Sequence, residues 1–150
     1  RLHTPAGLAG GDYLTLQRLL AGEDDELTRD CFGLFCSLMR LSYNDKHLEL
    51  VSWAEDAAQL TREQQRALLL DTARLLRESY VLHAGVPDIC YLWGEEADFC
   101  RKFAPFIGND NIEPLLAEIE TALAQISQNG NPTIVFTHFA LSVSKMINKR

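Results

Sequence analysis

Residues 61–83 read TREQQRALLLDTARLLRESYVLH, and this stretch decides the fold class of the chain. Thr61, followed three residues later by Gln64, fits a capping box, in which each side chain bonds the backbone amide of the other residue at a helix start. The residues that follow are mostly Arg, Leu, Ala and Gln, which favour helix. The stretch therefore predicts one long helix that runs to about His83.

The same helical spacing of apolar residues recurs on both sides of this stretch. It predicts six further helices, over about residues 12–22, 25–43, 46–60, 95–103, 111–128 and 132–148. Residues 84–94 are expected to form a loop, and no segment has the pattern of a strand. Short connections favour antiparallel neighbours. We therefore expect an all-α fold, a compact bundle of about seven helices.

Local signals mark where the last two helices begin and end. Asp110 or Asn111 is expected to cap the sixth helix, and the residues 129–131 (Asn-Gly-Asn) to end it. Pro132 then opens the last helix, because proline is tolerated at the first helical position. The sixth helix carries a regular apolar stripe of Ile112, Leu115, Leu116, Ile119, Leu123 and Ile126.

Two residues are expected at contacts between helices. Gly33 lies inside the helix over 25–43, where glycine costs about 1 kcal/mol relative to alanine, and close packing by a neighbour is the expected reason for it. Trp53 lies on the apolar stripe of the third helix. We interpret it as a core residue, although a tryptophan can also stack on nucleic acid bases. Trp93, in the expected loop, leaves both interpretations open.

The charge balance argues against a nucleic-acid-binding surface. The chain of 150 residues has a formal net charge of -7, and its 14 Lys and Arg residues are scattered. Only the tail concentrates them, at Lys145, Lys149 and Arg150. Clustered basic residues supply most of the affinity for phosphates. We therefore expect no direct contact with nucleic acid, and the ordinary apolar content of 47% indicates a globular chain rather than a disordered one.

The cysteine and histidine spacing gives no metal pattern. The four cysteines do not form a Cys-x-x-Cys pair, and the four histidines are dispersed along the chain. We expect reduced structural thiols, no cofactor, no signal peptide and no membrane span, and hence a cytoplasmic protein. Because the chain starts at Arg1 in the middle of a pattern, we interpret it as a piece of a longer protein.

Candidate catalytic groups have simpler explanations. The acidic runs 23–26 and 95–96 lie where helices begin, where carboxylates stabilise the helix dipole by about 0.3–1 kcal/mol each. His138 and Ser142 could pair on the last helix, but no nucleophile turn or third orienting group accompanies them. No phosphate-binding glycine loop is present. The sequence thus predicts no catalytic, cofactor or metal site.

The last helix is apolar on two sides. One broad face is expected to enter the core, whereas Ile134 and Leu141 project from the opposite side, flanked by His138 and Lys145. Such a helix is either central in its bundle or shared with a partner. The long helix over 61–83 has a weaker second stripe, formed by Leu70, Arg74, Arg77 and Val81. We take both groups as the candidate subunit interface.

Several stretches together resemble one protein family. They are Leu8–Tyr13 with Leu19-Leu20, Trp53–Glu55 with Leu60–Gln65, Leu75–Glu78, Phe103–Ile107 with Asn111–Glu113, and Asn129–Thr137. In order and spacing they are similar to the delta-prime subunits of the bacterial DNA polymerase III clamp loader, in the form found in the Bacteroides group. Residues 86–93 and the pair His138-Phe139 depart from the pattern of the family, which puts partner specificity on the last helix in doubt.

The resemblance implies a role in assembly. Residues 1–10 would end an upstream lid region, and residues 11–150 would form the C-terminal collar domain of an AAA+-type protein. In the family, the collar domains of five subunits pack in a ring, and delta-prime stands between the delta and gamma/tau subunits while the sliding clamp is loaded for DNA replication. The expected function is therefore a non-catalytic scaffold with delta and gamma/tau as partners. The collar domain of delta or gamma/tau is the alternative, and a helical hydrolase using the acidic clusters is a more distant one.

Overall fold

A computed structural model describes residues 23–85 and 94–148, and these ranges are helical without any strand. This confirms the all-α prediction. The helices are α2 (Glu23–Tyr43), α3 (His47–Ala58), α4 (Arg62–His83), α5 (Glu95–Phe103), α6 (Ile112–Ser127) and α7 (Pro132–Ile147), with a short 3₁₀ helix, η2 (Ala104–Phe106), after α5. The helix expected over 12–22, the segment 1–10, Cys90 and Trp93 lie outside the described residues.

The predicted helix starts of α4 and α7 are present in atomic detail. Thr61 Oγ1 accepts a hydrogen bond from the Gln64 amide at 3.1 Å, and Gln64 Oε1 accepts one from the Thr61 amide at 2.9 Å, which completes the capping box. Asn131 Oδ1 accepts from the Ile134 amide, and Pro132 follows as the first residue of α7. Local sequence thus sets both helix starts.

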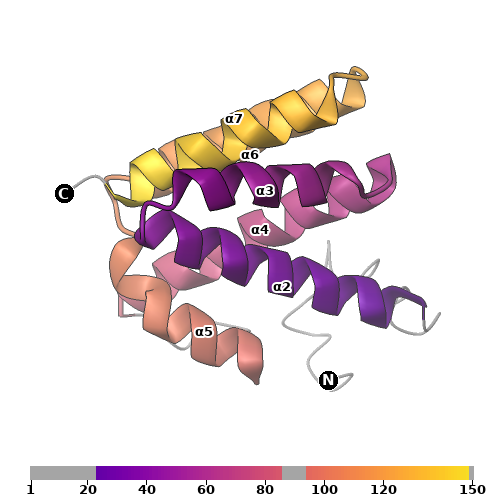
Figure 1. The fold of residues 1–150 in the computed structure, drawn as a ribbon. Coiled ribbons are helices and arrows are strands. Elements are labelled where there is room, and N and C mark those ends of the chain that lie inside the picture. Colours follow the sequence, from indigo (N-terminus) through magenta and orange to yellow (C-terminus); the bar gives the residue numbers. More distant parts are fainter. Residues whose placement is uncertain (1–22, 86–93, 149–150) are drawn as a thin grey trace.

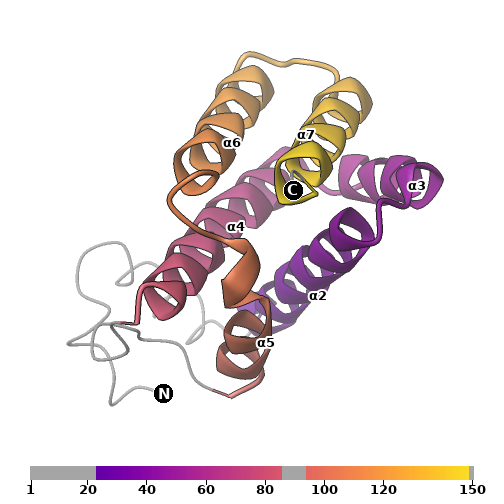
Figure 2. The same ribbon diagram turned by 90° about the vertical axis from the view of Figure 1, so that its left-hand side faces the viewer.

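The helices pack in one bundle in which α7 has the most central place. It lies against α3, α6 and α2, whereas α4 lies against α6, α2 and α5. Both α4 and α7 lie against α2 and α6, and Figure 2 shows α6 and α7 side by side with α4 behind them. Figure 1 shows α3 crossing in front of α4, with α5 at the edge of the bundle beside α2.

The inner face of α7 forms the centre of the core. Its buried members are Val135, Phe136, Phe139, Ala140, Val143 and Ile147. Trp53 of α3 packs edge-on against Phe136, and its indole N–H donates to the Leu34 carbonyl of α2 at 2.9 Å. A buried indole with its donor satisfied stabilises three helices at once. This confirms the interpretation of Trp53 as a core residue.

Two sequence expectations differ from the structure. Gly33 is exposed on α2, and a Cβ atom there would meet no atom of the described residues within 4 Å, so none of the described helices packs closely on this glycine. Asn111 precedes α6, but its side chain does not cap the helix. Instead Asn111 Oδ1 accepts from the Gly108 amide and its Nδ2 donates to the Phe106 carbonyl. The side-chain amide of Asn111 thus bonds backbone groups of the preceding turn and not the free amides at the start of α6.

Candidate protein interface

A stripe of exposed residues runs along the outer side of α7. Ile134 is 68% exposed and Leu141 36%, and both belong to the few large apolar residues at the surface of the described chain. His138 and Lys145 are exposed between and beyond them. The four residues, called here the α7 stripe, recur at steps of three and four and therefore lie on one side of the helix. The structure thus places Ile134 and Leu141 outside the core.

An open hollow of about 1140 Å³ continues this stripe onto α3. Its apolar walls are Leu48 and Val51 of α3 with Leu141 and Met146 of α7. Leu48 is 83% exposed, the largest value among the large apolar side chains described. Apolar surface gathered in one place on a protein is typical of an interaction site. We call this feature the α3–α7 hollow.

Leu48 is not among the interface residues expected from the sequence. On the same helix, Leu50 is buried in the core and Val51 is half-buried. Leu48 stands two residues before Leu50, which is about 200° around a helix. That angle was the available signal that Leu48 points away from the core.

The carboxylates at the hollow are each close to an imidazole. His47 Nε2 lies 2.8 Å from Asp45 Oδ1, and His138 Nε2 lies 3.6 Å from Glu118 Oε1. Lys145, in contrast, is exposed and has no ion-pair partner within residues 23–85 and 94–148. Among the described residues that line the hollow, Lys145 is therefore the cation available to an outside group.

The geometry around His138 does not resemble a nucleophilic relay. Ser142 Oγ lies 3.4 Å from His138 Nε2, and Glu118 approaches that same nitrogen. In a serine–histidine–acid relay, the base contacts the serine through one ring nitrogen and the acid through the other. The arrangement instead suits a surface histidine linking α6 to α7.

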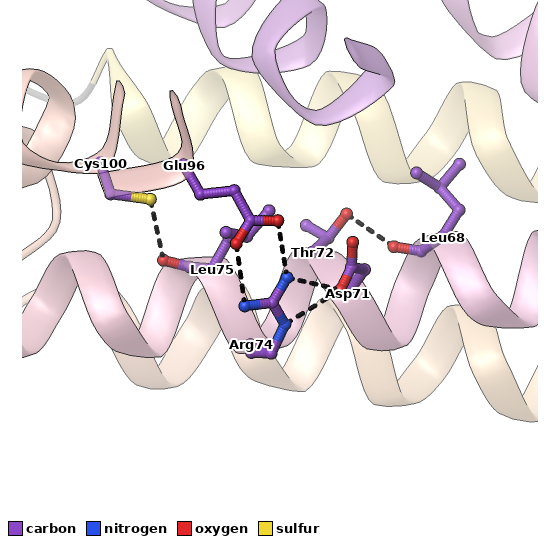
Figure 3. A network of polar contacts seen from close by, with 7 residues as sticks. All are labelled: Leu68, Asp71, Thr72, Arg74, Leu75, Glu96 and Cys100. Carbon is purple, nitrogen blue, oxygen red and sulfur yellow. Dashed lines mark hydrogen bonds and ion pairs between the residues drawn. The ribbon is translucent and has the colours of Figure 1, made fainter. Parts of the chain in front are cut away.

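The second predicted group, on α4, divides into an outer and an inner part. Leu70 is 47% exposed and Arg77 is exposed, whereas Val81 is half-buried. Arg74 turns toward α5: its Nη2 lies 3.0 Å from Glu96 Oε2 and 2.9 Å from Asp71 Oδ1 (Figure 3). Arg74 thus forms ion pairs within the domain, and Leu70 and Arg77 are the residues of this group that face solvent.

The Arg74 guanidinium is charged despite its burial. Burial acts to lower its pKa, but the attraction of Asp71 and Glu96 and their hydrogen bonds to it outweigh this effect and hold the pKa above its ordinary value. Glu96, which the sequence analysis assigned to the dipole of a helix start, therefore also fastens α5 to α4.

The structure does not bring the two predicted groups together. α4 and α7 each pack against α2 and α6 and not mainly against each other, so Leu70 and Arg77 do not adjoin the α7 stripe. Helical periodicity shows which residues share a side of one helix, but not which helices are neighbours. A single continuous surface from both groups is therefore not formed.

A second open hollow, of about 700 Å³, lies between α2 and α5. Phe32, Gly33 and Phe99 line it, and the Arg40 guanidinium stands 5.3 Å from the centre of the Phe99 ring. The missing side chain at Gly33 widens this hollow. Its rim mixes both signs of charge, with Glu95 and Asp98 beside Arg40 and Lys102.

The described residues lack the patterns of a metal site and of a membrane span. No group of three or more His, Cys, Asp or Glu side chains there is placed to hold a metal ion. The helices described there also lack the combination of length and apolar character that spanning a bilayer requires. Comparison with known protein families, with curated proteins and with solved structures finds no match.

Proposed function

We propose that this chain is a non-catalytic assembly domain that binds sister subunits through the outer side of α7. The observation that carries the proposal is the exposure of Ile134 and Leu141 on a helix whose opposite side is the centre of the core. A rigid helix held on three neighbours presents its outer residues in a fixed geometry, which lowers the entropic cost of binding.

The resemblance described above suggests which assembly this is. The proposed identity is the C-terminal collar domain of a delta-prime subunit of the bacterial DNA polymerase III clamp loader, acting in the cytoplasm. Its partners would be the collar domains of the delta and gamma/tau subunits, and its part in clamp loading would be scaffolding. The α7 stripe would meet one neighbour, and the separate position of Leu70 and Arg77 on α4 suits contact with the other.

The test is a binding measurement with two substitutions on α7. The Ile134→Asp, Leu141→Asp variant should keep its helical circular dichroism, because both side chains lie outside the core. We expect its affinity for the cognate delta or gamma/tau subunit to fall at least about 30-fold, the effect of losing an interface residue that contributes about 2 kcal/mol.

The matched control is Ala117→Asp with Thr121→Asp, two exposed positions on α6 that add the same charge. It should bind as the unchanged chain does. Unchanged binding by the α7 variant would contradict the proposal, and so would its unfolding, which would assign both residues to the core. Failure of the unchanged chain to bind either subunit would rule out the clamp loader identity.

A further inference from the structure

We propose that the α3–α7 hollow receives an amphipathic helix of a partner protein, which inserts a large apolar side chain between Leu48 and Leu141 and brings a carboxylate to Lys145. The proposal rests on the proposed function and specifies its partner chemistry. It extends the proposed interface from α7 onto α3, because the α7 stripe by itself contains no residue of α3.

The apolar part of the inference follows from Leu48. This side chain is 83% exposed and stands across the hollow from Leu141, with Val51 and Met146 in the walls between the two helices. Burying such surface against another apolar side chain is favourable in proportion to the area removed from water. Grooves of this kind accept the apolar side of a helix in many complexes.

The acidic part follows from the distribution of charge. The hollow is lined by two carboxylates, Asp45 and Glu118, and by one lysine, Lys145. Asp45 and Glu118 are each close to an imidazole, whereas Lys145 has no ion-pair partner in the described ranges. A partner carboxylate placed beside Lys145 therefore complements this cation.

The same charges disfavour a second copy of this chain as the occupant. In a symmetric dimer built on this surface, each copy presents the same patch to the other. The carboxylates that such a dimer offers to Lys145 at the hollow are Asp45 and Glu118 of the other copy, and each of them already has an imidazole beside it. A partner helix that brings its own carboxylate meets Lys145 without this competition.

The experiment measures binding of the 150-residue chain to the recombinant delta and gamma/tau subunits by calorimetry at two salt concentrations. Leu48→Asp is expected to weaken binding about 30-fold, as loss of a strong interface residue does, and Lys145→Glu about tenfold. Lys145→Arg should stay within about twofold, because it keeps the charge. Added salt should weaken binding of the unchanged chain but weaken binding of Lys145→Glu less, or strengthen it, because the substitution replaces an attraction by a repulsion that salt screens.

The matched controls make the same changes elsewhere. Arg66→Glu reverses an exposed charge on α4, and Ala117→Asp adds an acid to α6, neither of them at the hollow. Both should bind normally, and circular dichroism should show every variant folded; Leu48 and Lys145 are exposed, so unfolding of their variants would overturn the proposal.

The possible outcomes separate the two proposals. Binding of the unchanged chain, with undiminished binding by Leu48→Asp and Lys145→Glu, would overturn the inference and leave the assembly function standing. A dimer seen by sedimentation and dissociated by Leu48→Asp would assign the hollow to a second copy and overturn the choice of partner. Absence of any binding by the unchanged chain would remove both proposals.

Discussion

At the scale of single residues, two helix ends use residues other than glycine in the left-handed backbone conformation. Asp45 (φ 57°) follows α2 and Asn129 (φ 64°) follows α6, and both adopt the left-handed conformation that glycine usually supplies. After α6, the Gly130 amide donates to the Gln125 carbonyl at 2.7 Å and the Asn129 amide to the Ile126 carbonyl at 3.1 Å. These two bonds form a Schellman motif and satisfy carbonyls that the helix leaves open.

The role of Gly130 in this turn is close approach. A Cβ atom at position 130 would stand 2.8 Å from the backbone oxygen of Gln125, so Gly130→Ala must push the turn apart. We predict a loss of about 1–3 kcal/mol in the free energy of unfolding, the usual effect of overpacking, measured by urea titration. Asn129→Gly is the control and should be neutral or slightly stabilising, because glycine adopts positive φ freely. Equal stability of Gly130→Ala would contradict this role.

At the scale of helices, α5 depends on its contacts with α4. It has nine residues, too few for a stable helix by itself. Two links join it to α4: the paired hydrogen bonds between Arg74 and Glu96, and the Cys100 thiol pointing to the Leu75 carbonyl at 3.8 Å (Figure 3). Within α5 itself, Phe99 stacks on Phe103. The position of α5 therefore depends on a polar link that periodicity cannot reveal.

A double-mutant cycle tests this link. Arg74→Ala should lower the free energy of unfolding by about 2–3 kcal/mol, because it leaves Glu96 and Asp71 without the cation that compensates their burial. The coupling between Arg74→Ala and Glu96→Ala should be about 1–2 kcal/mol. Arg77→Ala, at an exposed position of the same helix, should change stability by less than about 0.5 kcal/mol. Additive effects of the two substitutions would show that the Arg74–Glu96 pair contributes nothing to the free energy of unfolding.

At the scale of the whole molecule, the core contains thiols whose ionisation opposes folding. Cys31, Cys36 and Cys100 are buried and form no disulfide with one another. Burial raises the pKa of Cys36 to about 11, against the opposing charge of Arg40. Burial likewise raises the pKa of Cys100 to about 12, although a hydrogen bond with Ser79 acts in the other direction. The folded chain thus binds these protons more tightly than the unfolded chain.

This difference predicts the direction of a pH dependence. Below about pH 8 the two thiols are protonated in both the folded and the unfolded chain, so they do not make the free energy of unfolding depend on pH. Above pH 9 the unfolded chain releases its protons first, so the free energy of unfolding should fall as pH rises toward 11 and 12. In urea titrations from pH 7 to 10.5, the Cys36→Ala, Cys100→Ala variant should show a shallower fall. Val143→Ala, a buried change without a thiol, should keep the original slope; an identical slope in both variants would contradict the assignment.

Much of the proposed interface was accessible to sequence reasoning because it lies on one helix. Ile134, His138, Leu141 and Lys145 share a side of α7 by periodicity, and the structure places all of them at the surface. Arg74 shared a side of α4 with Leu70 by the same reasoning, but its partner Glu96 is 22 residues away and belongs to another helix. Leu48 could not be assigned to the proposed interface from the sequence either, because this assignment depends on α3 lying beside α7.

By itself, the sequence determined that the chain is helical and where the helices begin and end, because caps, prolines and apolar periodicity act within a few residues. Only the tertiary structure decided which helices are neighbours. In it, the Ser144 hydroxyl donates to the Ser42 carbonyl, 102 residues earlier in the chain. Arg74 pairs with Glu96 of another helix, and Leu48 and Leu141 line the same hollow. Those outcomes depend on how the buried faces of the helices fit against one another, and no local pattern contains that information.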